Sequence, residues 1–386
     1  MSNVESSASD VAAVFDNEQL VLARQLAGLR KTELADRIGK TVSAVTSWET
    51  GIKRPTAASV RRLALALGVD ALFFTPVPSG LVQSVEQPHF RSLRSTSLRS
   101  RDQAFSYGKL ALAVSAALER QLEFPDVSLP EFERDLTPVE AARAARGALD
   151  VPEGPIAHIV RLMENNGVLV VFSPAQTAAV DAYSFRTSLR PVIILNPLKR
   201  DYFRQRFDVA HELAHLLLHH DVEPGSKVLE DQANAFAAEF LMPEKEIRDL
   251  LPSSMTRGGW TDLVRLKEHW GTSMAALLYR ARTLSVMSET TYKNAMTRMS
   301  VEGWRRHEPG PSLLPEMPSL LPRAIDILAE ANVPIDAVIG GGRVPRYLFS
   351  VITSRTPEEQ PAAELGGVVP AIGPELGEVR SLFSEA

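Results

Sequence analysis

The 386-residue sequence contains no cysteine. This absence excludes disulfide bridges, thiolate zinc sites and iron–sulfur clusters, and it fits a reducing compartment. No apolar run reaches the roughly 18 residues that a membrane-spanning helix needs. The first residues, MSNVESSASD, lack a basic stretch followed by an apolar one, so no secretory signal is predicted. We therefore expect a cytoplasmic protein with no membrane partner.

The chain has a small negative net charge of −5, from 42 Lys/Arg against 47 Asp/Glu, but its charge is unevenly distributed. Residues 17–72 hold nine Lys/Arg against five Asp/Glu, a net charge of +4, which leaves −9 for the rest of the chain. A locally basic module on an acidic chain is typical of a DNA-binding domain joined to another unit. The length also predicts two or three domains.

Hydrophobic periodicity and chain breaks predict an α+β multidomain protein, with an all-α N-terminal bundle and a mostly helical second part that carries a small β-sheet. Strands are expected at 168–172 and 190–196, and long helices at 201–220 and 229–241. The expected units are a flexible tail at 1–15, a bundle of about five short helices at 16–76, a linker with a helix near 102–122 at 77–135, a core at 136–250, its helical continuation at 251–310, and a partly disordered C-terminal segment at 311–386.

Residues 33–51, ELADRIGKTVSAVTSWETG, have the spacing of a helix-turn-helix. Counted from Lys31, the fifth position is Ala35, where a small residue lets two helices cross closely. The ninth position is Gly39, where a tight turn favours positive φ. Val45 and Trp48 are the apolar residues that would hold the second helix to the core. Over roughly residues 17–74 the sequence resembles the XRE (Cro/C1-type, phage-repressor-like) helix-turn-helix family.

This resemblance implies that Thr41 begins a recognition helix that lies in the major groove of a double-stranded DNA operator. The exposed residues of that helix would meet base edges, and nearby basic residues would meet phosphates. The base-edge candidates are Val42, Ser43, Thr46 and Ser47, and the phosphate candidates are Lys31, Lys40, Lys53 and Arg54. Lys31 stands where the family often has glutamine.

Such regulators read two half-sites, which predicts a homodimer, with the helix near 102–122 as the candidate contact. The alternative to DNA binding is a helical bundle with solvated charges, or a DNA-binding fold reused for protein contacts.

Residues 207–220, FDVAHELAHLLLHH, contain a His-Glu-x-x-His motif. On a helix, His211 and His215 project from one face, so both imidazoles can bind one metal ion. Glu212 is rotated off that line and can reach a metal-bound water. With no cysteine and no third histidine at the extended-motif spacing, the third ligand is expected to be a carboxylate. The alternative is a buried helix with incidental polar residues, but a buried glutamate is costly without a partner.

The segment LEDQANAFAAEFLMP, residues 229–243, brings a second resemblance. Together with RPVIILN, RFDVAHELAHLLLH, SMAALLYRA and GWRRHEP, it resembles the ImmA/IrrE (DUF955) metallopeptidases over roughly residues 155–310. The resemblance implies a zincin-like fold, a Zn²⁺ cofactor, Glu230 as the third ligand, and Asn234 placed to hydrogen-bond a ligand histidine.

Other polar residues near the motif have weaker claims on the metal. Glu239 is the alternative third ligand, although it lies nine residues beyond Glu230. His219 and His220 are expected at the surface or beside the ligand histidines, because three histidines in successive turns of a straight helix cannot all bind one ion. The candidates for stabilising an oxyanion are Tyr183, Tyr202 and Arg206, and the strand at 190–196 is the candidate edge for an extended substrate.

Together, the two resemblances predict a DNA-binding transcriptional regulator with a zinc-dependent, gluzincin-like endopeptidase domain in which Glu212 is the general base. In the ImmA/IrrE family the peptidase cleaves a helix-turn-helix repressor. The substrate would then be a partner repressor or this chain itself, cut within residues 75–135. The alternative is a non-proteolytic regulator, or an antitoxin-like or prophage-type repressor, in which the zincin-like domain serves as a sensor or dimerisation module.

Overall fold

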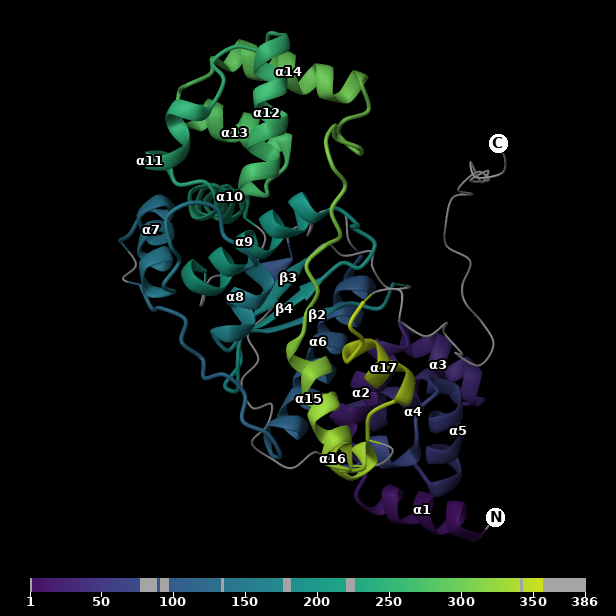
Figure 1. Ribbon diagram of the computed structural model, residues 1–386. Coiled ribbons are helices and arrows are strands. Elements are labelled where there is room, and N and C mark those ends of the chain that lie inside the picture. The colour runs from purple at the N-terminus through teal and green to yellow at the C-terminus, as the bar shows by residue number, and fades with distance from the viewer. Residues whose placement is uncertain are drawn as a thin grey trace, which may run out of the picture.

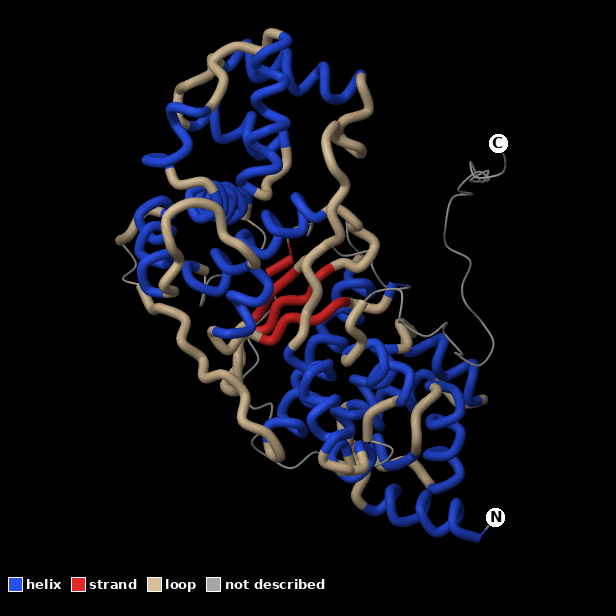
Figure 2. Tube along the Cα trace, viewed as in Figure 1, coloured by secondary structure: helices blue, strands red, loops and turns tan. Residues whose placement is uncertain are grey.

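The computed structural model describes residues 2–76, 89–90, 97–132, 135–175, 182–219, 226–340 and 343–356. Helices surround one small sheet, so the expected α+β class is confirmed (Figures 1 and 2). The last thirty residues, for which disorder is expected, lie outside the described residues. Within the described ranges, no helix is both long enough and apolar enough to cross a membrane.

The α-helices are α1 (Ser2–Ala13), α2 (Asn17–Leu26), α3 (Lys31–Ile38), α4 (Val42–Glu49), α5 (Ala57–Leu67), α6 (Leu98–Glu119), α7 (Pro138–Ala148), α8 (Ile159–Asn165), α9 (Tyr202–Leu218), α10 (Lys227–Leu241), α11 (Glu244–Ile247), α12 (Arg257–Trp270), α13 (Met274–Thr283), α14 (Glu289–Val301), α15 (Leu320–Glu330), α16 (Ile335–Ile339) and α17 (Arg346–Ile352). Two 3₁₀ turns are η1 (Ala71–Phe74) and η3 (Arg248–Leu250). The strands are β1 (His89–Phe90), β2 (Leu169–Phe172), β3 (Tyr183–Phe185) and β4 (Val192–Leu195).

Helices α2 to α5 and η1 form the expected N-terminal bundle. Ala35 is fully buried where helices cross, and Gly39 ends α3 with φ 63°, a conformation that favours glycine. Val45 and Trp48 are buried as expected. Residues 1–15, expected as a flexible tail, are instead helical over α1, which packs on α5. The reason is an apolar stripe that includes Ala8 and Val11, both of which are buried.

The strand order in the sheet is β1-β3-β4-β2. β2 and β4 are parallel, and β3 is antiparallel to both β4 and β1. Residues 190–196 were expected to offer a free edge to a substrate, but that expectation is wrong, because β4 is paired on both sides. The sequence gives no sign of this, since a strand in the middle of a sheet and an edge strand can have the same short apolar run.

The sheet separates two hydrophobic cores, and the side chains of β2 alternate between them. Val170 and Phe172 point into the first core, with α7 to α10 and α12 to α14, whereas Leu169 and Val171 point into the second. The second core contains the N-terminal bundle, α6 and α15 to α17. Burial on both faces explains why the strands read as continuous apolar runs rather than alternating ones.

Helix α6 joins the N-terminal bundle to the sheet. On the bundle side, Gln103 Nε2 donates to the Leu26 carbonyl at 2.9 Å, and Ser106 Oγ donates to Gln25 Oε1 at 2.8 Å. The helix is buried along most of its length, so it does not offer the free face expected of a dimer contact.

On the sheet side, α6 approaches the strands closely. Tyr107 Oη donates to the Phe172 carbonyl at 2.8 Å. A Cβ at Gly108 would lie 2.6 Å from the Phe185 ring, so only glycine permits this approach. Helix α6 therefore packs against both the bundle and the sheet.

The chain between α14 and α15 runs from the first core to the second (Figure 1). The buried Glu316 pairs with Arg206 of α9 and accepts from the Val160 amide of α8 at 2.8 Å. Glu164 of α8 accepts from the Ser319 amide at 2.8 Å, just before α15 begins. After this anchor the chain passes to α15, α16 and α17 in the second core.

Candidate functional site

Helix α9 carries the His-Glu-x-x-His motif. Asp201 caps its N-terminus by accepting from the Arg204 amide at 3.1 Å, and its apolar side packs against β3 and β4. His211 and Glu212 are fully buried and His215 is almost so. The motif therefore lies in the interior, between the sheet and α10.

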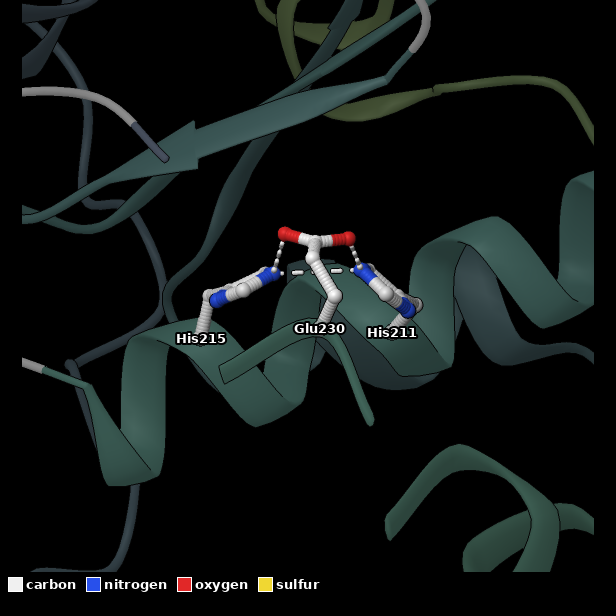
Figure 3. Close-up of side chains that lie close together, drawn as sticks. All are labelled: His211, His215 and Glu230. Atoms are coloured by element: carbon white, nitrogen blue, oxygen red, sulfur yellow. Dashed lines mark hydrogen bonds and ion pairs between the residues drawn. The ribbon is translucent and has the colours of Figure 1, made fainter. Parts of the chain in front are cut away.

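Helix α10 brings a carboxylate to the two histidines. Glu230 Oε2 lies 3.3 Å from His211 Nε2, and Glu230 Oε1 lies 3.5 Å from His215 Nε2. Figure 3 shows one carboxylate oxygen directed to each imidazole. The candidate ligand atoms of these three residues all lie within 4.8 Å of one another. The three residues predicted as ligands are therefore brought together.

The remaining ring nitrogens have partners that determine the tautomers. His211 Nδ1 donates to Asn234 Oδ1 at 3.1 Å, because a carbonyl oxygen only accepts. His219 Nε2 likewise donates to Gln232 Oε1 at 3.0 Å, so its Nδ1 accepts from His215 Nδ1 at 2.8 Å. The Nε2 atoms of His211 and His215 are then unprotonated, and their lone pairs point toward the same position.

This arrangement fits a bound metal cation. The Nε2 atoms of His211 and His215 are only 3.1 Å apart, and two lone pairs facing each other beside a carboxylate need a positive charge between them. Burial raises the pKa of Glu230, but the interactions of its carboxylate with His211 and His215 outweigh it and lower that pKa to about 2. The carboxylate is thus ionised, as a metal ligand must be.

His219 and Gln232 form a hydrogen-bonded pair that positions His215, and only His219 of the two was considered in the sequence analysis. His219 was expected at the surface or beside a ligand, and it is buried against His215. Gln232 was missed, and because it lies two residues after Glu230 it is rotated by about 200° from that ligand around α10, so helical spacing gave no signal for it. His220 lies outside the described residues.

Glu212 lies beside the candidate metal-binding group of His211, His215 and Glu230, and a residue of the sheet hydrogen-bonds to it. Ser184 Oγ of β3 donates to Glu212 Oε2 at 2.7 Å and lies 3.2 Å from the Glu212 carbonyl oxygen. Ser184 is fully buried and was not predicted from the sequence. Its signal is weak, because a serine in the short segment AYSF has no distinguishing spacing.

Glu239 does not join the cluster. Its buried carboxylate pairs with Arg280 and lies 2.6 Å from Arg143 Nε. Nine residues correspond to two and a half helical turns, so Glu239 faces away from Glu230.

The oxyanion candidates are also engaged elsewhere. Tyr183 Oη donates to the Ala104 carbonyl of α6, in the second core. Arg206 is tied to Glu316 and the Gly271 carbonyl, and its guanidinium lies over the Tyr202 ring.

The candidate DNA-reading surface is the outer side of α4. Thr41 caps this helix by accepting from the Ala44 amide at 3.2 Å. Exposure follows the expected face: Val42 and Ser43 are exposed, Thr46 and Ser47 are half-buried, and Lys40 and Lys53 are exposed.

Two of the basic residues expected at phosphates have partners within the protein. Lys31 Nζ lies 3.1 Å from Glu49 Oε2, and the same buried carboxylate pairs with Arg24. Arg54 donates to the carbonyl of Ala13 at the end of α1. Lys40 and Lys53 are therefore the better candidates for phosphate contacts.

The fold and the site define a helix-turn-helix DNA-binding module joined to a metallopeptidase-type domain. Residues 20–74 match the family model described as helix-turn-helix, and residues 163–282 match the model described as IrrE N-terminal-like domain. The combination of XRE-type and ImmA/IrrE-type modules expected from the sequence is thereby confirmed. No curated protein matches the chain. The chain is a DNA-binding regulator with a protease-like domain, and it contains a His/Glu group of metal-binding type.

Proposed function

We propose that this protein is a transcriptional regulator whose second domain is a zinc-dependent endopeptidase that cleaves a repressor-type protein, either a partner or another copy of itself. The observation that carries the proposal is the convergence of His211, His215 and Glu230, with Glu212 in the same helical turn. Two imidazoles and one carboxylate are a ligand set of catalytic zinc sites, which keep a position for water.

The chain's own residues account for the proton transfers. Zinc bound at this group supplies a Lewis acid that polarises a peptide carbonyl and activates water. Glu212 accepts the proton of the attacking water and delivers it to the leaving amine. Ser184 holds one carboxylate oxygen of Glu212 by its 2.7 Å hydrogen bond, and Asn234 and His219 orient the two imidazoles.

Metal content tests the ligand set. We expect about one zinc per chain in the wild type and a large loss in His211→Ala and Glu230→Ala, because each substitution removes one of three ligands. Zinc is measured by mass spectrometry of acid-digested protein after dialysis. Asp231→Ala is the matched control, since Asp231 neighbours Glu230 but pairs with Lys227 at the surface. Full zinc content in Glu230→Ala would contradict the assignment.

Cleavage itself is tested by intact mass. The purified protein is incubated alone and with β-casein as an unfolded probe, with zinc or with a chelator. Fragments that form only with zinc support the peptidase. A zinc-loaded chain that cuts neither itself nor casein favours the second candidate below.

DNA contact is tested through salt dependence. Lys53→Ala should weaken operator binding and reduce the slope of log K against log salt by about 1, because one phosphate contact is lost. Lys31→Ala is the matched control and should leave the slope nearly unchanged, since Lys31 pairs with Glu49. Fluorescence anisotropy at several salt concentrations, on operator DNA selected from a random pool, gives both slopes. Equal slopes in the two variants would contradict the assignment. The same titration gives the number of protein chains bound per operator, which should be two for the homodimer expected of such regulators.

The second candidate function is a non-proteolytic regulator, including repressors of the antitoxin or prophage type, with the zincin-like domain as a sensor. One observation favours it: the bundle, α6 and one face of the sheet share a single core. A structural change at β3 could therefore be transmitted to α2 through the side chains that pack around α6. In this candidate, zinc removal changes operator affinity although the zinc-loaded protein cuts no probe.

A further inference from the structure

The outer edge of β3 lies directly beside the candidate catalytic glutamate. Helix α9 packs along β3, and Ser184 of β3 donates to Glu212 Oε2 at 2.7 Å. A sheet edge presents a row of backbone N–H and C=O groups, and extended peptides bind proteins by adding a strand to such an edge. Because β4 covers the inner edge of β3, the outer edge is the one available to a peptide near Glu212.

That outer edge is paired with the chain's own residues. β1 runs antiparallel to β3, with His89 opposite Ser184 and Phe90 opposite Tyr183. The backbone of His89 therefore lies opposite the very residue that holds Glu212. An extended segment of this protein occupies the place where an extended substrate would lie.

The described elements before and after β1 in sequence are already linked by packing without it. η1 before it and α6 after it both belong to the second core and are connected through the bundle. Residues 89–90, between these two elements in sequence, nevertheless pair with the sheet edge beside α9. The pairing covers two residues, against the five or six of an average strand, so it is weak enough to be displaced.

We propose that the outer edge of β3 is the peptide-binding edge of the metallopeptidase-type domain, and that residues 89–90 occupy it in cis as an inhibitory strand. The peptide-binding role rests on the proposed function. A tethered segment competes at an effective concentration on the order of millimolar, so a second peptide binds well only after the resident strand leaves. This competition keeps the outer edge of β3 covered while residues 89–90 are paired with it.

The test is a binding measurement that does not depend on turnover. A fluorescein-labelled peptide with the sequence of residues 84–95, SVEQPHFRSLRS, is titrated with full-length zinc-loaded protein and followed by anisotropy. Every protein carries Glu212→Gln, so no cleavage consumes the probe. One protein has no further change, a second has His89→Pro and Phe90→Pro, and a third has His89→Ala and Phe90→Ala.

Proline removes the backbone donors of β1, whereas alanine keeps them. We expect the proline variant to bind the peptide at least about tenfold more tightly than the first protein, because the resident strand no longer competes. The alanine variant should stay within about threefold of the first protein, since its backbone donors remain. A peptide with proline at the same two positions should not bind the proline variant.

Two results would overturn the proposal. Equal affinity in the first protein and the proline variant would show that residues 89–90 do not block the edge. Absence of binding to every protein, with circular dichroism and operator binding intact, would show that the edge does not take peptides. Because binding is measured without cleavage, either result is distinct from a failure of the peptidase proposal, which is judged by the casein fragments.

Discussion

Glu212→Gln should reduce the rate of zinc-dependent cleavage by about 10²- to 10⁴-fold, the usual contribution of a general acid–base group. Glutamine has nearly the same shape and still accepts the Ser184 hydrogen bond, but its amide cannot take a proton from water. Zinc content should stay near one per chain, because Glu212 is not in the group formed by His211, His215 and Glu230. The rate is measured from the appearance of casein fragments at equal zinc loading.

The matched control for this prediction is Glu302→Gln. Glu302 is exposed and follows α14, and its 3.9 Å ion pair with Arg298 makes no contact with the site. It should cleave at the wild-type rate. A Glu212→Gln protein that cleaves as fast as Glu302→Gln would exclude Glu212 as the base and would favour the sensor function.

The spacing within the motif predicts a large part of the site because the helix is a local structure. His211 and His215 are four residues apart, and the α-helical repeat alone places them on one face. The same reasoning separates Glu239 from Glu230, and the structure places Glu239 with Arg143 and Arg280 instead.

Contacts between elements far apart in sequence could not be derived in this way. Ser184 reaches Glu212 from β3, a strand of three residues, for which no periodic pattern can develop. His219 could be placed on the correct helix face, but its partner Gln232 belongs to another helix.

Helix α6 was predicted from the sequence, but its packing between the bundle and the sheet was not. Its neighbourhood was interpreted as a linker because proline, glycine and serine flank it. Its buried residues surround nearly the whole helix axis, however, as expected for a helix enclosed between a bundle and a sheet. The close approach of Gly108 to Phe185 is a tertiary contact that no composition reveals. The N-terminal bundle and one face of the sheet therefore share a core that includes α6.

Glu316→Ala should be the most destabilising single substitution among those considered, lowering the free energy of unfolding by about 3–5 kcal/mol. It would leave the guanidinium of Arg206, which is 1% exposed, without its carboxylate partner in the interior. It would also remove the acceptor of the Val160 amide and release the segment that leads to α15. Urea denaturation followed by circular dichroism measures the loss, with the exposed Glu302→Ala expected within about 0.5 kcal/mol of the wild type.

The pH dependence of the free energy of unfolding gives a second measure of what the ion pair of Arg206 and Glu316 contributes to stability. Burial raises the pKa of Glu316, but the hydrogen bond with His158 and the charge of Arg206 outweigh it and hold the pKa below its usual value. A carboxyl whose pKa is lower in the folded state stabilises the protein at and above its ordinary pKa, and this stabilisation is lost as the pH falls toward the folded-state pKa. Acidification should therefore narrow the difference in free energy of unfolding between the wild type and Glu316→Ala.

A double variant separates the two causes of the lost stability. If Arg206→Met combined with Glu316→Leu lowers the free energy of unfolding less than Glu316→Ala alone, the unpaired charge of Arg206 rather than lost packing is the cause. A double variant as unstable as the sum of its single variants would instead assign the loss to packing.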